Sequence, residues 1–549
     1  MTDYIPTQEQ LALITTDSSA VVEAGPGRGK TATAIAAADA WAGRHPAARV
    51  LFTSFSNAAV RRIAKEAGLA QHHANLEFRT YHSVAFDLLR LYGRFAGLPA
   101  PAQVLDKTEE HLIALTEDWP DDGDAYAANR REYARQTGRV AFKDMIPLVT
   151  SLLQVSGTLR RVIQRRYGCI VVDEFQDTTD EQWTFLQLLA EKSRLLVFGD
   201  PHQMIGDVDF NATKARFAAC AKWKGVPVTP FVGRNYRCAA TDVLDFADAI
   251  LHGTPHTPAG TSLQCTAAFT TARRYEVTRQ WKVFRHMDAD SSIAIIAPSA
   301  KVSREVASDI RTPPDNAVMP IPIRAHVEPD EAAADAVRLA VYAAADYARD
   351  RSTVHCHQLA VAIVAMERAW NRSGKVDLAR VAKVENTLRS GSKKKSALRT
   401  FMESGPSADI GVFAQRFVEA MASDALFKST GEAIVKTGLP HFRMHTDPEA
   451  RFTSYRSARV PVGLHGRLCA PHGTTVLSMH RAKGREFDYV ILLVDPRAHP
   501  QSATLGELQR LHYVGCTRAR RQLAVIWNAA EKGPVLSPVL DPEHAGTPS

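Results

Sequence analysis

The first half of the chain alternates short apolar runs with longer segments of helical character. Val21-Val22 precedes a glycine-rich turn and a helix-prone stretch from Thr31 to Trp41. Val50–Phe52, Ile170–Val172 and Leu195–Phe198 are further apolar runs of strand length. Because these runs are continuously apolar and separated by helices, they predict a parallel β-sheet covered on both faces.

The second half repeats this pattern. Strands are predicted at Ile293–Ile296, Val476-Leu477, Val490–Val494 and Leu523–Ile526. A second α/β domain with its own parallel sheet is therefore expected.

Two segments between these strands are predicted to be mainly helical, at about 91–155 and 326–464. In the second, Asp330 is a candidate cap for a helix with apolar residues at Val337, Val341 and Ala345, and another helix is expected over Leu359–Trp370. From about Pro534 the sequence is rich in Pro and Gly, which predicts a loose tail.

Composition narrows the function only slightly. The chain has 549 residues, which corresponds to about three to four domains, and 45% of them are hydrophobic. A net charge of +8 permits a polyanionic partner without establishing one. Seven scattered cysteines without a CxxC pair disfavour a zinc or iron–sulfur site and suit a reducing cytosol. No signal pattern or bilayer-spanning run is seen, so a cytoplasmic protein without a membrane partner is expected.

A phosphate-binding loop is predicted after the first strand. Gly25, Gly27, Arg28, Gly29, Lys30 and Thr31, followed by Ala32, open a helix with the spacing of a P-loop, although Ala24 replaces its usual first glycine. Backbone N–H groups and the helix N-terminus attract phosphate oxygens. Lys30 is expected to reach the β- and γ-phosphates, and the Thr31 hydroxyl to ligate Mg²⁺.

The apolar strand at Ile170–Val172 ends in an acidic run. Carboxylates at the carboxyl end of a parallel strand face the ligand-binding edge of the sheet. We expect Asp173 to hold Mg²⁺ through water, and Glu174 to orient and deprotonate the attacking water. Nucleoside triphosphate hydrolysis, with ATP and Mg²⁺ as cofactors, is therefore the predicted chemistry.

With Ala24–Thr31 and Asp173–Asp177 together, the sequence resembles superfamily 1 helicases of the UvrD/Rep/PcrA group. Further motifs occur in that family's order from near Gln10 to near Arg520. The resemblance implies an ATP-dependent DNA helicase that moves along single-stranded DNA, with 3′→5′ polarity.

The resemblance also implies roles for residues in the first half. Gln10 falls in the Q motif and would read adenine. Phe55 and Asn57 fall in motif Ia, where Phe55 would contact bases. Thr80 and His82 fall in motif Ib, a turn that contacts the DNA backbone.

Other implied roles involve both halves of the chain. Gln203 in motif III would sense the γ-phosphate. In motif IV, Tyr236 would stack on adenine and Arg237 would reach the γ-phosphate. The remaining implied residues are Glu486 on the ribose and His480 on DNA in motif V, and Arg518 as the arginine finger of motif VI.

The resemblance predicts four domains. Two RecA-like parallel-sheet motor domains would comprise residues 1–90 with 156–230, and 231–325 with 465–533. Two mostly helical accessory domains would be inserted at 91–155 and 326–464, and a tail would follow at 534–549. ATP would lie between the motor domains, so hydrolysis would be coupled to closure.

The segment after Gln203 departs from the family. Gly206 stands where an aromatic residue is expected, and only Phe210, displaced along the chain, is available to stack on a base. The basic segments Lys393–Lys395 and Arg451–Arg459 are candidate contacts for duplex phosphates.

Three hypotheses follow. The first is a motor on single-stranded DNA and single-strand/duplex junctions, with a nuclease, repair or defence protein as a possible partner. The second is a nucleotide-dependent DNA-binding sensor subunit of a larger complex, which the altered motif III favours. The third is a small-molecule NTP enzyme, for which DNA-independent hydrolysis would be the signature.

Overall fold

A computed structural model gives the fold. It describes residues 4–540 apart from 55–74, 100, 106–109, 111–112, 115–116, 118, 121–122, 206–209, 233–234, 239–240, 270–271, 312–321, 324, 328–339, 342, 372–377, 391–396, 405–409, 424–472 and 500–501. Asp330, Val337, Phe55, Asn57, Lys393–Lys395 and Arg451–Arg459 therefore lie outside the described residues.

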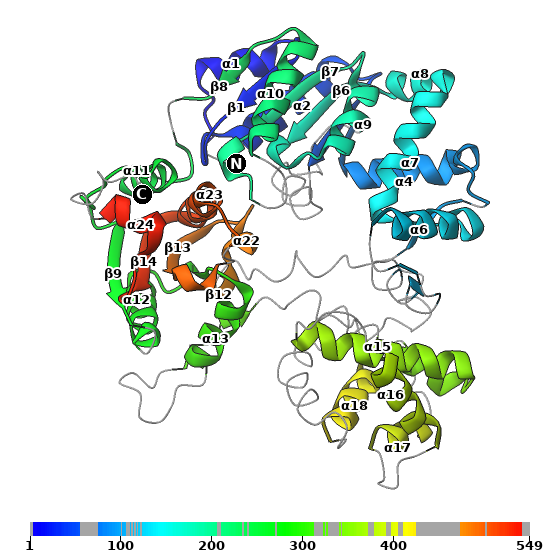
Figure 1. The fold of residues 1–549 in the computed structure, drawn as a ribbon. Helices are drawn as coiled ribbons and strands as arrows, with labels where there is room; N and C mark the ends of the chain where they lie inside the picture. Colours follow the sequence, from blue (N-terminus) through cyan, green and yellow to red (C-terminus); the bar gives the residue numbers. More distant parts are fainter. Residues whose placement is uncertain are drawn as a thin grey trace. The chain divides into compact units, whose positions relative to one another are not determined.

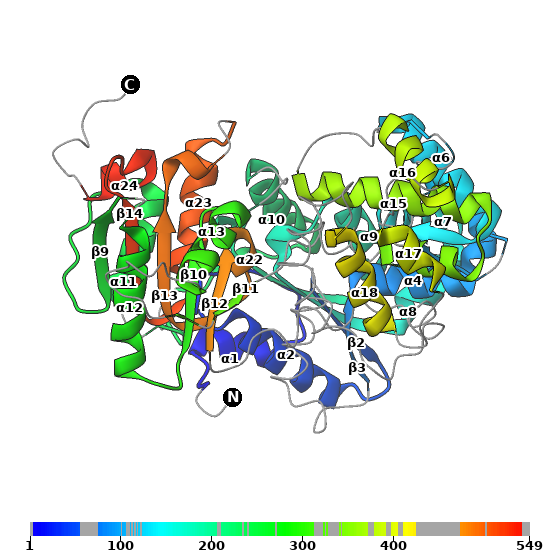
Figure 2. The ribbon, with the colours of Figure 1, turned by 90° about the horizontal axis from the view of Figure 1, so that it is seen from below.

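The first sheet is parallel and has the strand order β3-β2-β6-β7-β1-β8. Figure 1 labels β6, β7, β1 and β8, and Figure 2 labels β2 and β3. All four strands predicted for this half are present, and their apolar residues are almost fully buried. The strands are β1 (Ala20–Glu23), β2 (Arg49–Ser54), β3 (Leu76–Thr80), β6 (Tyr167–Asp173), β7 (Arg194–Gly199) and β8 (Val228–Pro230), and the helices that accompany them are α1 (Gln8–Thr15), α2 (Lys30–Arg44), α8 (Gly157–Arg166), α9 (Asp180–Ala190) and α10 (Phe210–Lys224).

The second sheet is also parallel, with the order β11-β12-β10-β13-β14-β9. It confirms the four strands predicted for the second half. Its strands are β9 (Leu263–Ala268), β10 (Ser292–Ala297), β11 (Ala325–Val327), β12 (Gly473–Ser478), β13 (Phe487–Val494) and β14 (Ala519–Asn528), and its helices are α11 (Thr241–His252), α12 (Arg273–Met287), α13 (Ala300–Arg311), α22 (Met479–Ala482), α23 (Leu505–Cys516) and α24 (Gly533–Leu540). The predicted α/β class with two parallel sheets is confirmed.

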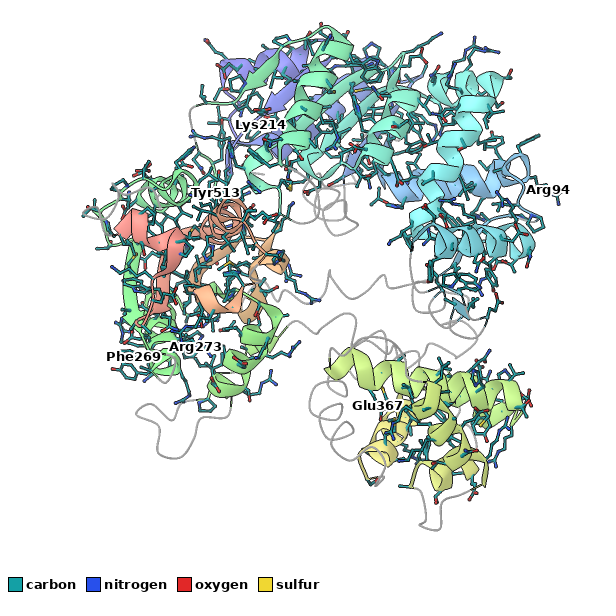
Figure 3. The ribbon with its side chains drawn as sticks, viewed as in Figure 1. Arg94, Lys214, Phe269, Arg273, Glu367 and Tyr513 are labelled. Carbon is teal, nitrogen blue, oxygen red and sulfur yellow. The ribbon has the colours of Figure 1, made fainter. Side chains whose placement is uncertain are left out.

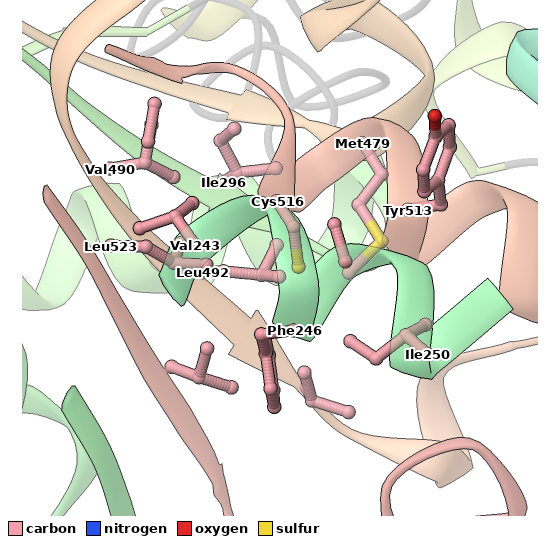
Figure 4. Close-up of a cluster of buried hydrophobic side chains, with 14 of the residues drawn as sticks. Val243, Phe246, Ile250, Ile296, Met479, Val490, Leu492, Tyr513, Cys516 and Leu523 are labelled. Atoms are coloured by element: carbon pink, nitrogen blue, oxygen red, sulfur yellow. The ribbon is translucent and has the colours of Figure 1, made fainter. Parts of the chain in front are cut away.

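Helix α23 packs very closely on the second sheet. A Cβ atom on Gly515 would lie 2.9 Å from Leu492 Cδ1, so a larger residue would have to displace this buried side chain. Cys516 and Tyr513, from the same helix, and Leu492, from β13, belong to one buried cluster (Figure 4). This packing fixes the end of α23, from which Thr517 and Arg518 follow directly.

The prediction of a loose tail from Pro534 is wrong for its first residues. Gly533–Leu540 form α24, and Val535, Leu536 and Val539 are buried in the core of the second sheet domain. Proline is well tolerated in the first turn of a helix, where its missing N–H costs no hydrogen bond, so Pro534 does not prevent this helix from forming.

The chain divides into two compact units. One contains both sheets and comprises Met1–Ala85, Val149–Glu328 and Gly466–Ser549; the other comprises Phe86–Leu148 and Pro329–His465. In the second unit, a helical group has its own apolar core and is formed by α15 (Thr353–Asn371), α16 (Leu378–Ser390), α17 (Ala397–Glu403) and α18 (Ile410–Ser423) (Figure 2). Helix α15 contains the helix predicted over Leu359–Trp370, and Val341 and Ala345 are buried in the same core.

The segment between α4 (Tyr81–Tyr92) and α8 combines helices with a small two-stranded sheet. It contains α6 (Gly123–Thr137), α7 (Phe142–Val155), β4 (Gln103–Leu105) and β5 (Arg139–Ala141). Arg130 joins α6 to α7 through hydrogen bonds of 2.6 and 2.9 Å to the Asp144 carboxylate, and it donates a third to Glu110. These charge-assisted hydrogen bonds to two carboxylates offset the cost of burying the guanidinium charge, so Arg130 can occupy a core position.

Candidate nucleotide and nucleic-acid site

A polar cavity of about 450 Å³ lies between the two sheet domains. Its walls come from the P-loop, from the ends of β6 and β7, and from segments of the second domain. The lining residues are Gly27, Arg28, Gly29, Lys30, Thr31, Ala32, Glu174, Gln203, Tyr236, Arg237, Gly484, Glu486, Arg518 and Arg520. Most residues predicted to bind the nucleotide are therefore brought together, although their roles stay predictions.

The P-loop curls through two glycines in the left-handed region. Gly27 has φ 71° and Gly29 has φ 80°. A Cβ on Gly27 would fall 2.2 Å from Asn235 Oδ1, so the absence of a side chain also leaves room for this residue of the second domain. The Lys30 ammonium donates to the carbonyls of Ala24 (2.5 Å) and Gly25 (2.9 Å). Burial lowers the pKa of Lys30, while Asp200 and Glu174 counteract that shift.

Thr31 and Asp173 form the candidate magnesium site. The Thr31 hydroxyl donates to Asp173 Oδ2 at 2.8 Å, although the two residues come from α2 and the end of β6. A hydroxyl and a carboxylate beside a phosphate loop are the hard oxygen donors that Mg²⁺ prefers, so the residues fit this ion. In the described part of the chain no three His, Cys, Asp or Glu side chains converge on a metal site, which leaves phosphate and water to complete the coordination.

Glu174 has an unusual backbone. Its φ of 57° is the one positive value among the described non-glycine residues. Such conformations are strained and often occur at functional sites. Here it turns the chain from β6 into η3 (Phe175–Asp177) and places the Glu174 carboxylate in the cavity wall.

A chain of hydrogen bonds links Glu174 to the second domain. Gln176 Nε2 donates to Glu174 Oε2 at 2.6 Å, and the backbone N–H of Asp200 donates to Gln176 Oε1 at 3.0 Å. Gln203 Nε2 then donates to Asp200 Oδ2 at 2.8 Å, and Arg518 Nη2 donates to Gln203 Oε1 at 2.9 Å. The candidate base and the candidate arginine finger are thus joined across the cleft.

The charged side chain of Arg518 is buried, and hydrogen bonds hold it in place. It is 1% exposed, and its Nε donates to the Val514 carbonyl at 2.8 Å while Nη1 donates to the Arg485 carbonyl at 3.3 Å. These bonds come from the second domain, whereas Gln203 belongs to the first. The guanidinium fork therefore bridges the two domains.

Glu486 lies between two arginines. Arg237 Nη2 is 2.5 Å from Glu486 Oε1, and Arg520 Nη2 is 3.1 Å from Oε2. Arg520 lines the cavity but was not among the predicted site residues. Its position near the start of β14, two residues after the predicted arginine finger Arg518, could have indicated from the sequence that it lies at the site.

The residues predicted to contact nucleic acid differ in their exposure to solvent. His480 is exposed on α22, whereas Thr80 is 6% exposed and its hydroxyl accepts a hydrogen bond from Ser83 N. His82 is half-buried, and burial lowers the pKa of its imidazole, which favours the neutral form at pH 7. The geometry thus assigns Thr80 a part in the turn itself.

Phe210 lies among cationic side chains from both sheet domains. The Arg510 guanidinium carbon is 4.6 Å and the Lys214 ammonium 5.2 Å from the centre of its ring, and the His202 ring is 5.5 Å away. Lys214, which is labelled in Figure 3, belongs to α10 of the first domain. Arg510 belongs to α23 of the second domain. The predicted stacking platform is therefore already in cation–π contact in this structure.

With this geometry established, two family models match the chain. The model described as an AAA domain matches residues 7–208, and the UvrD-like helicase C-terminal domain matches residues 471–530. The chain belongs to the UvrD-like superfamily 1 helicases.

Distant relatives agree with this family. The ATP-dependent DNA helicase UvrD2 of Mycobacterium tuberculosis is 25% identical over 446 residues, which cover 76% of this chain and 57% of the relative. The ATP-dependent DNA helicase Rep of Escherichia coli is 25% identical over 29% of this chain and 30% of its own, and the ATP-dependent DNA helicase PcrA of Leuconostoc citreum is 32% identical over 24% of this chain and 17% of its own. This UvrD-like chain thus spans little more than half of the UvrD2 relative.

Among the described helices, none is both long and apolar enough to cross a lipid bilayer.

A second contact between the sheet domains joins Asp177 to Lys483. Asp177 ends η3, three residues after Glu174, and Lys483 follows α22, which carries His480. The Lys483 ammonium forms an ion pair with the Asp177 carboxylate. Burial raises the pKa of Asp177 from 3.8 to about 6, and the attraction of Lys483 offsets this only in part.

Replacing Asp177 by Asn is expected to raise the unfolding temperature at pH 8. A carboxylate whose pKa is higher in the folded state binds a proton more readily there, so its ionisation destabilises the fold above about pH 6. The gain in the free energy of unfolding should be of the order of 1–3 kcal/mol. It should shrink as the pH falls towards 5, because wild-type Asp177 then becomes protonated too.

Calorimetry of both proteins from pH 5 to pH 8 measures this difference. Glu181→Gln, which removes one exposed charge on α9, is the matched control and should show no such trend. A difference in unfolding temperature that is constant over this pH range would contradict the prediction.

Proposed function

We propose that this UvrD-like chain is an ATP-dependent motor that moves along single-stranded DNA and opens duplex DNA at junctions. The observation that carries the proposal is the hydrogen-bonded connection from Glu174 through Gln176, Asp200 and Gln203 to Arg518. It joins the site of hydrolysis to both sheet domains.

The cavity suits a magnesium-bound triphosphate. Thr31 and Asp173 would hold Mg²⁺, which neutralises phosphate charge and helps orient the phosphates. Lys30 would exchange its two carbonyl partners for phosphate oxygens, which are charged and therefore stronger acceptors. Arg237, now paired with Glu486, and Arg518 would provide positive charge from the second domain.

Glu174 is proposed to orient the attacking water and to take its proton. Its neighbour Gln176 donates to one carboxylate oxygen at 2.6 Å, which orients the carboxylate in the cavity wall. Gln203 is held by Asp200 on one side and by Arg518 on the other, so a γ-phosphate that draws Arg518 away would alter this contact. Hydrolysis would then change the contact between the domains and advance the chain along DNA.

DNA would lie on the surface that carries His480 and the motif Ib turn. His480 is exposed, and its helix α22 is followed directly by Lys483, which pairs with Asp177. A movement of His480 with DNA would therefore be transmitted to the segment that follows Glu174. The 3′→5′ direction of movement comes from the family resemblance.

A sensor subunit is the second candidate. The ring of Phe210 contacts Arg510 and Lys214. If these cations stay in place on DNA, stacking on a base is prevented and the grip on DNA is weaker. The chain would then bind DNA in a nucleotide-dependent way within a larger complex, with a nuclease or repair or defence protein as partner, and would unwind little alone.

Steady-state ATP hydrolysis with and without single-stranded DNA tests the motor proposal. We expect strong stimulation by DNA and unwinding of duplexes that carry a 3′ single-stranded tail. Stimulation without unwinding by the isolated chain would favour the sensor. A rate that is unaffected by DNA would contradict coupling and favour a small-molecule NTP enzyme.

A further inference from the structure

We propose that Arg520 is a positioning residue of the nucleotide site, which holds the Glu486 carboxylate so that Arg237 is released to bind the γ-phosphate. The proposal rests on the proposed hydrolytic function, in which Arg237 reaches that phosphate. Its consequence is that Arg520 contributes to the binding of ATP but not to the binding of ADP.

The register of the second sheet places Arg520 next to Glu486. Glu486 directly precedes β13, and Arg520 is the second residue of β14. The two strands are parallel neighbours with Phe487 opposite Ala519, and the Phe487 N–H donates to the Arg518 carbonyl at 3.0 Å. Both charged side chains line the cavity. Their backbones cannot separate unless the pairing of β13 with β14 changes.

Arg237 reaches Glu486 from a different segment, which is bonded to the P-loop. The backbone N–H of the preceding residue, Tyr236, donates to the Gly27 carbonyl at 2.7 Å. Arg237 Nη2 lies 2.5 Å from Glu486 Oε1, and Nη1 donates to the Thr517 carbonyl at 3.4 Å, which is a long hydrogen bond. A triphosphate on the P-loop therefore offers this guanidinium a second anion close to its own backbone.

The two arginines contact different oxygens of Glu486. Arg237 pairs with Oε1, whereas Arg520 donates to Oε2 from Nε at 3.2 Å and from Nη2 at 3.1 Å. If Arg237 turned to a phosphate, the carboxylate would keep its bonds to Arg520. Without Arg520, this carboxylate, whose side chain is only 18% exposed, would face the triphosphate with neither cation beside it. Arg520 therefore lowers the cost of moving Arg237.

This cost arises only for a nucleotide with a γ-phosphate, because ADP lacks the group that would draw Arg237 from Glu486. Replacing Arg520 by Gln should weaken the binding of ATP relative to ADP by about three- to fivefold, the upper range for a partly exposed ion pair. Arg237 has moved in both the ATP complex and the transition state, so the loss is the same in both. The KM for ATP should therefore rise, while kcat stays within about twofold of wild type.

Two further variants show whether the charge at this position is what matters. Arg520→Lys should keep most of the wild-type ratio of ATP to ADP affinity, because both bonds from Arg520 go to one oxygen, which a single ammonium can also reach. Arg521→Gln is the matched control. Arg521 is the next residue and pairs with Asp288 at 2.7 Å outside the cavity, so its loss should leave the ratio unchanged.

Direct attraction of the phosphates by Arg520 is the alternative explanation, and a double variant separates the two. With Glu486→Gln, the carboxylate that holds Arg237 is gone, so adding Arg520→Gln should have no further effect on the ratio of ATP to ADP affinity. Direct attraction would weaken ATP by the same factor in this background as in the wild type.

Equilibrium binding of ATP and ADP to the full chain carrying Glu174→Gln measures these ratios without hydrolysis. Steady-state hydrolysis by chains that retain Glu174 gives KM and kcat. A ratio in Arg520→Gln within about 1.5-fold of wild type, or an equal loss in the Glu486→Gln background, would overturn the proposal. If the ratio falls as expected but single-stranded DNA does not stimulate hydrolysis, the role of Arg520 stands and only the proposed motor function fails.

Discussion

Glu174→Gln is expected to reduce the kcat of DNA-stimulated ATP hydrolysis by about 10²–10⁴, the usual contribution of a general base. The substitution removes the negative charge that accepts a proton from water but keeps the size and shape of the side chain. Gln176, which donates to Glu174 Oε2 at 2.6 Å, can still donate to an amide oxygen at that position. The link towards Gln203 and Arg518 should therefore persist.

Nucleotide binding should survive this substitution. The groups expected to hold the phosphates are on the P-loop and the second domain, and Glu174 itself repels a polyanion. The affinity for nucleotide should thus stay the same or rise, while turnover is lost.

Steady-state hydrolysis and equilibrium nucleotide binding, measured on the same preparation, separate these effects. Glu181→Gln, exposed on α9, is the matched control and should keep wild-type turnover. If Glu174→Gln retained more than about a tenth of the wild-type kcat, the base would have to be another group.

Arg518→Lys is expected to lower kcat by about 10³–10⁵, the range known for arginine fingers. A lysine keeps the charge but has a single ammonium in place of a planar fork. It cannot at once donate to Val514, Arg485 and Gln203, as the guanidinium does at 2.8, 3.3 and 2.9 Å. Both the transition-state charge and the bridge between the sheet domains would be affected.

Because Arg518 is buried, its variant needs a test of folding as well as activity. The unfolding temperature is expected to fall somewhat, because a lysine leaves buried acceptors of the guanidinium unpaired. The affinity for single-stranded DNA without nucleotide should remain near wild type, since it does not depend on the γ-phosphate. Arg521→Lys is the matched control, because Arg521 pairs with Asp288 at 2.7 Å outside the cavity and should leave kcat unchanged. A higher KM with normal kcat in Arg518→Lys would show that this residue binds the nucleotide without stabilising the transition state.

The strands that the sequence predicted correctly are the buried ones. β6, β7, β10 and β13 lie inside their sheets, and each contains an unbroken apolar run that makes its pattern easy to recognise. Strands such as β3 and β9 lie at sheet edges and mix polar with apolar residues, which explains why they were missed. Helix α24 was missed because its prolines outweighed the apolar spacing of Val535, Leu536 and Val539.

The sequence by itself determined the family, the two parallel sheets, and the residues of the P-loop and acidic motif. These features are local, because a phosphate loop needs its glycines and lysine at fixed spacing and a buried strand needs a continuous apolar run. The tertiary structure alone decided which partners these residues have. Arg518 and Gln203 are 315 positions apart in the sequence yet bonded. The Gln10 amide accepts a hydrogen bond from the Thr7 backbone and donates one to the Arg28 carbonyl. Hydrogen-bonding capacity is finite, so a side chain's chemistry depends on which neighbours the fold has already supplied.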